Sequence, residues 1–203
     1  MRNLILSFIT LLYIAIAQPA VADINPGDAA PDFTAKAADG SDVTLASLKG
    51  KTIVLEWANY ECPFSKMHYE SGNLPSLQET YTGKGVTWLT VLSSAPGKQG
   101  YYSLSDAPAR NEQMKNHATH VLLDATGTIG KLYGAKTTPH LYVIDAGGIV
   151  QYNGAIDSIP SVDAKTLAEA RPLAANAIDA VLAGKKPEMA SNQAYGCSIK
   201  YAD

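Results

Sequence analysis

Cys62 is the residue whose position in this sequence most clearly predicts chemistry. It follows an apolar, strand-forming segment at residues 52–58 and precedes a helix-forming segment that begins near Ser65. The first turn of a helix has unpaired backbone N–H groups and the positive end of the helix dipole, and both stabilise an anion. A thiol at this position has a lowered pKa and becomes a nucleophile near neutral pH. The alternative is a buried cysteine with a structural role only.

Cys197 is the only other cysteine among the 203 residues, so it is the only residue that could form a disulfide with Cys62 within the chain. As a resolving thiol, it would attack oxidised Cys62 either in a mixed disulfide or as a sulfenic acid. Its place on a mobile C-terminal tail with little periodicity would allow it to approach and withdraw. Two alternatives are a permanent structural disulfide and an unpaired thiol.

The sequence around Cys62 resembles the active-site region of thioredoxin-like redoxins. It is most similar to the peroxiredoxin-like branch of the alkyl hydroperoxide reductase/thiol-specific antioxidant family. Four segments carry the resemblance in the order found in that family, namely residues 56–67, 93–100, 138–145 and 195–201. The resemblance, which extends from about residue 27 to the C-terminus, implies an α/β, thioredoxin-like fold. Such a fold has a central mixed β-sheet flanked by helices, here with an N-terminal β-hairpin extension.

The same resemblance implies an exported thiol-based oxidoreductase with antioxidant activity, which reduces peroxides or disulfides with Cys62 as its nucleophile. Its partners would be protein or small-molecule thiols and disulfides, or hydroperoxides. We expect the catalytic residues to be Cys62, Cys197, Pro139, Thr138 and Glu56, and the substrate-binding residues to be Trp57, Asn59, Pro63, Phe64, Ser65 and His140. The sequence has no phosphate-loop or dinucleotide-binding motif, and we expect neither a cofactor nor a metal.

Two residues depart from the patterns of related redoxins. Ser65 stands where thioredoxins have the second cysteine of a Cys-x-x-Cys motif, so the chain cannot close that short disulfide. Asn59 stands three residues before Cys62, where a typical peroxiredoxin has the threonine or serine that orients peroxide. The second departure argues against fast reduction of peroxide.

Thr138-Pro139 resembles the cis-proline loop that faces the active cysteine in thioredoxin folds. A cis bond here would leave the backbone groups of Thr138 free to pair with an extended substrate chain. The alternative is an ordinary trans proline that opens a strand, because cis bonds are a small minority of bonds before proline.

Glu56 lies within the apolar segment at residues 52–58, where a buried carboxyl group would have a raised pKa and could shuttle the proton of a thiol. Alternatively, Glu56 pairs with a nearby lysine. His68, on the helix after Cys62, and His140, after the proline, could each flank the thiol or lie on the surface.

Hydrophobic periodicity predicts strands that alternate with helices, followed by a hairpin and a final helix. The expected strands are residues 32–37, 41–45, 52–58, 86–92, 121–124, 141–145 and 149–153. The expected helices are residues 65–81, 108–117, 128–133 and 173–182. Gly72 and Pro75 predict a kink or break in the first of these helices.

The first 22 residues predict a secretory signal. A short positive start is followed by an apolar run at residues 4–17 and by the small residues Ala20 and Ala22, which predict cleavage after Ala22. An uncleaved membrane anchor is the alternative, although a bilayer-spanning helix needs about 20 apolar residues. We therefore expect a periplasmic or secreted protein with a redoxin domain at residues 23–184 and a tail at residues 185–203 that carries Cys197.

The net formal charge is −3 at pH 7 and the sequence has no basic cluster, so we expect neither nucleic acid nor, after signal cleavage, a membrane as partner. Two other functions are compatible with the sequence. One is a non-catalytic binding module that docks extended peptides at the Thr138-Pro139 loop, which the missing Cys-x-x-Cys motif suggests. The other is a structural protein stapled by a Cys62–Cys197 disulfide.

Overall fold

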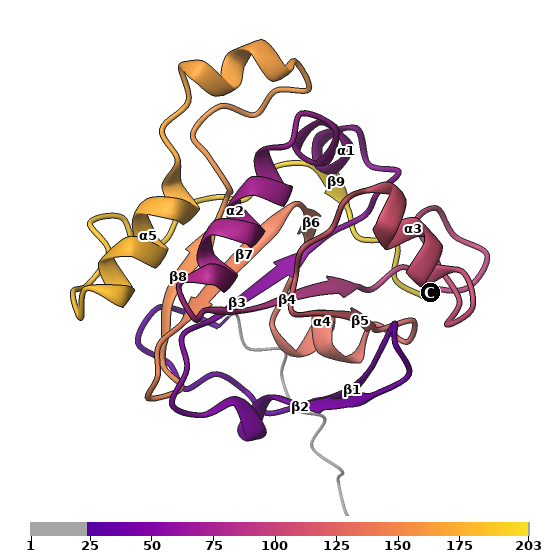
Figure 1. Cartoon of the computed structure of the whole chain (residues 1–203), viewed down its shortest axis with the longest axis horizontal. Coiled ribbons are helices and arrows are strands. Elements are labelled where there is room, and N and C mark those ends of the chain that lie inside the picture. The colour runs from indigo at the N-terminus through magenta and orange to yellow at the C-terminus, as the bar shows by residue number, and fades with distance from the viewer. Residues whose placement is uncertain (1–23, 203) are drawn as a thin grey trace, which may run out of the picture.

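The computed structural model describes residues 24–202, so the predicted signal segment lies outside the described residues. Seven strands form one sheet: β1 (Thr34–Ala37), β2 (Asp42–Thr44), β3 (Ile53–Trp57), β4 (Thr87–Leu92), β5 (His120–Leu123), β7 (His140–Ile144) and β8 (Val150–Gly154). Their order is β2-β1-β5-β4-β3-β7-β8 (Figure 1). The neighbours β3, β4 and β5 are parallel, and the outer pairs are antiparallel. This mixed sheet, with the hairpin β1–β2 at one edge, confirms the predicted fold class.

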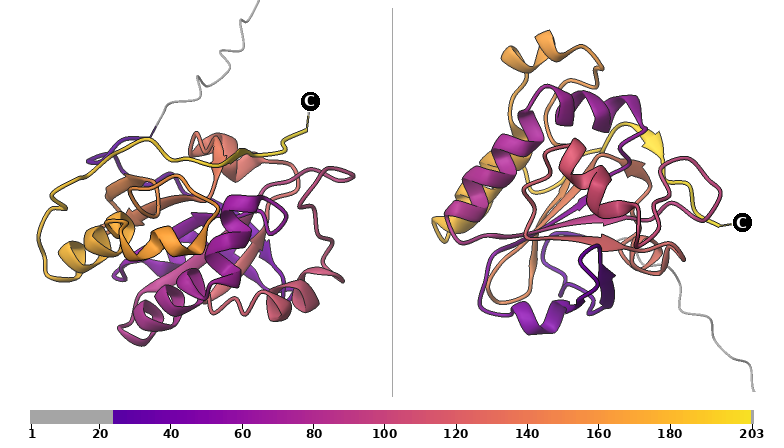
Figure 2. Two further views of the ribbon diagram at one scale, coloured as in Figure 1. Left: turned by 90° about the horizontal axis from the view of Figure 1, so that it is seen from above. Right: turned by 45° about the vertical axis from the view of Figure 1, so that its right-hand side comes forward.

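Helices cover both faces of the sheet. The helices of the described chain are η1 (Leu45–Leu48), α1 (Pro63–Glu70), α2 (Asn73–Gly83), α3 (Ala107–Gln113), α4 (Thr128–Leu132), η2 (Ala164–Ala168) and α5 (Leu173–Leu182). α1, α2 and α5 pack on one face, whereas α4 and η1 pack on the other (Figure 2). None of the helices between residues 24 and 202 has the length and apolar character needed to cross a membrane.

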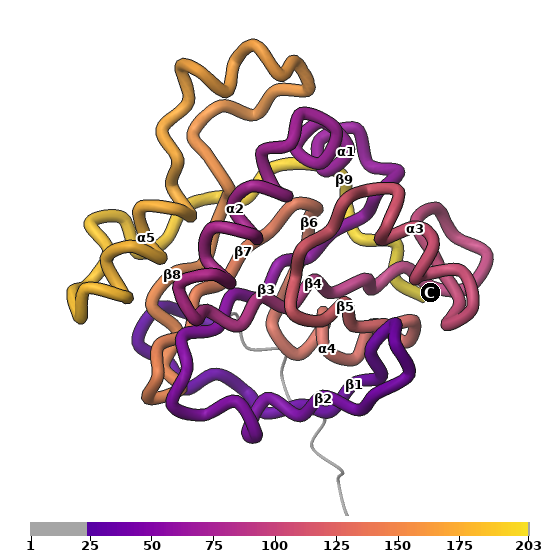
Figure 3. The backbone as a smooth tube through the Cα atoms, viewed as in Figure 1, coloured from indigo at the N-terminus to yellow at the C-terminus, as the bar shows by residue number. Residues whose placement is uncertain are grey.

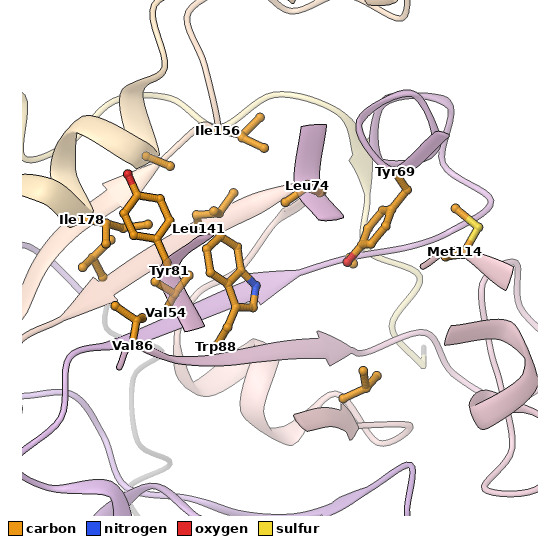
Figure 4. Close-up of a cluster of buried hydrophobic side chains, with 14 of the residues drawn as sticks. Val54, Tyr69, Leu74, Tyr81, Val86, Trp88, Met114, Leu141, Ile156 and Ile178 are labelled. Carbon is orange, nitrogen blue, oxygen red and sulfur yellow. The ribbon is translucent and has the colours of Figure 1, made fainter. Parts of the chain in front are cut away.

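The core consists of two clusters separated by the sheet. Figure 4 shows side chains from the helices, including Leu74 and Ile178, directed toward Val54 and Trp88 of the sheet. Leu55, the next residue of β3 after Val54, belongs to the opposite cluster, because successive side chains of a strand point to opposite faces. β3, β4 and β7 are therefore buried along their whole length, as strands covered on both faces must be.

The helix predicted at residues 65–81, with a kink or break from Gly72 and Pro75, is divided into two helices. The break is at Gly72, whose φ of 80° is the left-handed conformation that favours glycine. Pro75 lies in the first turn of α2, where no backbone N–H donor is needed, and so it does not interrupt that helix. The segment at residues 158–172, which contains η2, projects beyond α1 (Figure 1) and was not predicted as a separate element.

The C-terminal tail is docked on the domain rather than detached from it. After α5 it runs past β8 and past the short strand β6 (Thr137–Thr138), with which β9 (Cys197–Ser198) forms a two-stranded sheet (Figure 3). Asn192 accepts a hydrogen bond from the Ala155 N–H (2.8 Å), and the Tyr201 hydroxyl donates to the Ala135 carbonyl (2.7 Å). The tail that the sequence predicted to be mobile thus has contacts with the domain on both sides of Cys197.

Candidate active site

The backbone places Cys62 at the start of α1. Cys62 is the N-cap residue of this helix and Pro63 is its first residue, so the helix begins two residues earlier than the predicted start near Ser65. Proline is favoured at this position because its missing N–H is not needed there and its φ suits a helix. The Cys62 carbonyl accepts a hydrogen bond from the Lys66 N–H (2.8 Å). The predicted location of the thiol at a helix N-terminus is thus present in the structure.

The Thr138-Pro139 loop faces the thiol. The peptide bond between these residues is cis, and the Cys62 Sγ lies 3.1 Å from the Thr138 carbonyl oxygen. The cis form that the resemblance implied is therefore the observed one. The Thr138 backbone is not free, however, because this residue pairs with Cys197 in the β6–β9 sheet. The docking edge expected at this position is therefore occupied by the chain's own tail.

The two thiols lie against each other. Both cysteines are reduced, and the Cys197 thiol forms a hydrogen bond with Cys62. Burial alone would raise the pKa of Cys62, but the interactions of its sulfur with the Cys197 thiol and with the backbone N–H of Ser65 outweigh burial and lower the pKa. Burial, together with the neighbouring Cys62, raises the pKa of Cys197 to about 11. Cys62 is therefore the thiol that ionises first, and Cys197 keeps its proton and donates a hydrogen bond to the Cys62 sulfur.

Access to the two sulfurs differs. The Cys62 side chain has an exposed fraction of 0%, whereas Cys197 is partly exposed. The tail strand β9, which pairs with β6 beside the thiol, contributes to this cover. Cys62 is nevertheless surrounded by hydrogen-bonding groups and not only by aliphatic side chains, which distinguishes it from an inert core cysteine.

Three predicted substrate-binding residues lie close to Cys62 in the chain, and two of them contact other segments around the site. The Asn59 side chain accepts a hydrogen bond from the Glu61 N–H (2.9 Å) and donates to the Gln99 carbonyl (3.3 Å). Phe64 packs against the ring of Tyr195, with ring centroids 5.7 Å apart. Pro63 is exposed. Asn59 therefore connects the Cys62 loop to the segment at residues 93–100, which the resemblance had identified.

Ser65 is buried beside Cys62. Its backbone N–H donates to the Cys62 sulfur, and its hydroxyl has no hydrogen-bond partner among the described residues. Ser65 stands on the first turn of α1, at the position where thioredoxins have their second cysteine. Ser65 thus contributes to the site through its backbone.

Trp57 and His140 lie in an aromatic cluster. They are opposite each other in the β3–β7 pair, and both contact Tyr142, with centroid distances of 5.4 and 4.8 Å. The His140 ring is hydrogen-bonded to Asn153 (2.6 Å), and burial lowers its pKa to about 4. The contacts of these two side chains indicate that they support the sheet beneath the site, and substrate binding by them stays a prediction.

Glu56 is fully buried on the other face of β3. Its carboxylate accepts hydrogen bonds from Tyr69 (2.7 Å), Trp88 (2.7 Å), Gln78 (2.9 Å) and Thr90 (3.2 Å). The alternative of a Glu56–lysine pair is therefore wrong, because the side chains that donate hydrogen bonds to this carboxylate are all neutral. Burial raises the pKa of Glu56, an effect that these hydrogen bonds partly offset. Its connection to the site runs through Tyr69, which belongs to the helix that begins after Cys62.

A chain of buried polar side chains anchors the tail two residues before Cys197, and of its members only His68 was a candidate from the sequence. The Tyr195 hydroxyl donates to Asp157 (2.7 Å) and lies 3.1 Å from the Nε2 atom of His68. The Nδ1 atom of His68 lies 2.8 Å from the Asn73 amide nitrogen. A neutral imidazole protonated on Nε2 satisfies all of these contacts. His68, Asp157 and Tyr195 together hold Cys197 over Cys62.

This anchor predicts a loss of stability in acid. Burial lowers the pKa of His68 to about 4, although Asp157 opposes the shift. Between pH 6.5 and pH 4 the unfolded chain binds a proton at His68 and the folded protein does not. The free energy of unfolding therefore decreases as the pH is lowered through this range, by up to about 3 kcal/mol. Urea unfolding at several pH values would measure this slope.

The control for this prediction is a pair of glutamine variants. His68→Gln should reduce the dependence of stability on pH, whereas His117→Gln, at an exposed histidine, should leave it unchanged. An equal slope in wild type and His68→Gln would contradict the assignment of a neutral, buried imidazole.

Comparison with known proteins gave a family match and structural neighbours. The model of the AhpC/TSA family matches residues 26–153. A search of curated proteins gave no match. The solved structure of a hypothetical protein from Sinorhizobium meliloti has a TM-score of 0.73 and 25% sequence identity, over 89% of this chain and 97% of that chain.

Two further solved structures are similar. An uncharacterised conserved protein from Geobacillus kaustophilus has a TM-score of 0.74 and 26% identity, over 88% of this chain and 93% of that chain. A Chlorobium tepidum protein described as a thiol:disulfide interchange protein has a TM-score of 0.52 and 26% identity, over 64% of this chain and 84% of that chain.

Proposed function

The chain belongs to the AhpC/TSA family of thioredoxin-fold proteins, and on this premise we propose that it is an exported thiol:disulfide oxidoreductase with Cys62 as nucleophile and Cys197 as resolving thiol. The observation that carries the proposal is the contact between the two thiols at the start of α1, opposite Pro139. With Cys197 beside it, Cys62 has a second thiol with which it can form a disulfide, so the pair can transfer two electrons to a substrate.

The reaction consists of two thiol–disulfide exchanges. The Cys62 thiolate attacks one sulfur of a substrate disulfide, that S–S bond breaks, and the other sulfur leaves as a thiolate that takes up a proton. Cys197 then loses its proton and attacks the Cys62 sulfur, which releases the second substrate thiol and leaves a Cys62–Cys197 disulfide. The substrate gains two electrons, and an external dithiol returns the protein to its reduced state.

Disulfides suit this site better than peroxides do. Peroxide reduction requires a polar group that orients the peroxide oxygen beside the thiolate. Asn59, which stands at that position in the sequence, has both polar atoms of its amide engaged by the Glu61 N–H and the Gln99 carbonyl. We therefore assign peroxide reduction, and with it an antioxidant activity, as the slower reaction of the same thiol.

The rival functions are less well supported. A peptide-binding module without turnover gives no role to the Cys197 thiol beside Cys62 or to the lowered pKa of Cys62. A permanent staple is disfavoured by the two pKa directions, because a thiol that ionises readily is a good leaving group and makes its disulfide labile. Export rests on residues 1–22, whose charged start, apolar run and small residues are those of a cleaved signal.

Mass spectrometry of the purified chain tests the proposal. Oxidised glutathione should convert the reduced protein to a Cys62–Cys197 disulfide, and in Cys197→Ser it should accumulate on Cys62 as a mixed disulfide. An equal concentration of hydrogen peroxide should produce the internal disulfide at least about tenfold more slowly. Glutathione attached to Cys197 with Cys62 unmodified would overturn the assignment of the nucleophile. A faster reaction with peroxide would overturn the choice of substrate.

A further inference from the structure

The tail strand lies where a bound polypeptide would lie. Cys197 is opposite Thr138 and Ser198 is opposite Thr137 in an antiparallel pair that ends directly before Pro139. The Ile199 N–H donates to the Lys136 carbonyl (3.0 Å), which continues the pairing by one residue. Addition of an extended strand to an exposed edge is a common way of binding peptides, with backbone hydrogen bonds giving affinity and side-chain pockets giving specificity.

The residue before Cys197 has to be glycine. Gly196 has a φ of 127°, a conformation that residues with a side chain rarely adopt. A Cβ atom at this position would overlap the carbonyl oxygen of Thr138. Only a strand with glycine directly before its cysteine can therefore approach the Thr138 backbone as closely as this one does.

The residue two positions before Cys197 fills a specific pocket. The ring of Tyr195 packs against Phe64 and against the imidazole of His68, with centroid distances of 5.7 and 6.5 Å. Its hydroxyl donates to the buried carboxylate of Asp157. This pocket accepts a phenol, with an apolar wall for the ring and a charged acceptor at its end.

These contacts do not depend on the covalent connection between the tail and the domain. Any polypeptide with the same local sequence would place its own cysteine sulfur against Cys62. Because one edge of β6 can pair with only one strand at a time, such a polypeptide would have to displace the tail. The tail competes at the high effective concentration of a tethered segment.

We propose that residues 195–199 are an internal copy of the substrate strand, so that the substrate is an extended polypeptide segment with tyrosine two residues before, and glycine directly before, its disulfide-bonded cysteine. This inference rests on the proposed function and adds to it the class of substrate and the residues that select it. The partner is another polypeptide, and the tail protects Cys62 until that partner is present.

Peptide disulfides provide a direct test. The probe is a synthetic peptide with the sequence of residues 194–200, whose cysteine is disulfide-bonded to thionitrobenzoate. Attack by Cys62 joins the peptide to the protein and releases the coloured thiolate, so the absorbance measures the rate. In Cys197→Ser, this peptide should react at least about tenfold faster than the same peptide with Gly196→Ala or Tyr195→Ala, since each change removes a contact or adds an overlap.

A second experiment changes the protein instead of the peptide and weakens the binding of the tail to the domain. Tyr195→Phe combined with Cys197→Ser keeps the ring but removes the hydrogen bond to Asp157, so the tail should be displaced more easily and the unmodified peptide should react several-fold faster. Circular dichroism checks that this variant is folded. Equal rates for the three peptides in both proteins would overturn the inference, as would a wild-type dimer in which Cys62 is bridged to Cys197 of a second copy.

A small disulfide separates failure of this inference from failure of the proposed function. If oxidised glutathione reacts with Cys62 while the peptides do not differ, the inference about the substrate fails and the oxidoreductase remains. If neither glutathione nor any peptide reacts with Cys62, the proposed function itself fails.

Discussion

Replacing Cys62 with serine is expected to abolish disulfide reduction and to leave the fold intact. A serine hydroxyl is not ionised near neutral pH, so the nucleophile is lost, and turnover should fall at least about a thousandfold. Serine fits the space of the buried thiol and can donate to the Thr138 carbonyl as the thiol does. The measurement is the rate of reduction of a disulfide-bonded peptide with dithiothreitol as electron donor, corrected for the uncatalysed reaction.

Cys197→Ser is the matched control, because the two cysteines contact each other but have different roles. This variant should carry out the first exchange and then stop as a mixed disulfide on Cys62, which mass spectrometry can locate. Comparable turnover in wild type and Cys62→Ser would contradict the role of Cys62. Loss of the first exchange in Cys197→Ser would show that Cys197 makes the initial attack.

Replacing Glu56 with alanine is expected to lower the free energy of unfolding by about 3–5 kcal/mol, because a buried cavity and buried donors without an acceptor each cost on the order of 1–3 kcal/mol. The carboxylate is fully buried and accepts four hydrogen bonds from Tyr69, Gln78, Trp88 and Thr90. Its removal leaves a cavity and donors without an acceptor. Urea denaturation followed by tryptophan fluorescence would measure the change.

Glu79→Ala is the control, since this glutamate is exposed on α2 beside Gln78 and should change stability by no more than about 0.5 kcal/mol. Glu56→Gln distinguishes a structural role from proton transfer. It should destabilise the protein while leaving the pH at which Cys62 becomes reactive unchanged, because Glu56 reaches the site only through Tyr69. A shift of that pH by a full unit would instead support Glu56 as the proton shuttle.

Local sequence was sufficient to predict the position of Cys62. The end of β3, the loop and the first turn of α1 involve neighbouring residues, and helix capping depends on residues within a few positions of each other. The alternation of side chains along β3 likewise follows from local geometry. The order of the four family segments was sufficient to predict the mixed sheet and the cis bond before Pro139.

The roles of individual side chains around Cys62 could not be predicted in the same way. Glu56 and Trp57 are adjacent, so they had to lie on opposite faces of β3, but the sequence does not say which face α1 covers. That choice depends on the packing of helices on the completed sheet. It places Trp57 in the cluster opposite α1 and connects Glu56 to α1 through Tyr69.

The sequence by itself determined that a thiol stands at the start of a helix, because strand, loop and helix form from contiguous residues. Only the tertiary structure decided that Cys197 lies on Cys62 and that the tail covers it. Those contacts join residues far apart in the chain, through the pairing of β9 with β6 and the anchoring of Tyr195 by His68 and Asp157. Such pairings depend on which edges and pockets the folded domain leaves open, and no local pattern specifies them.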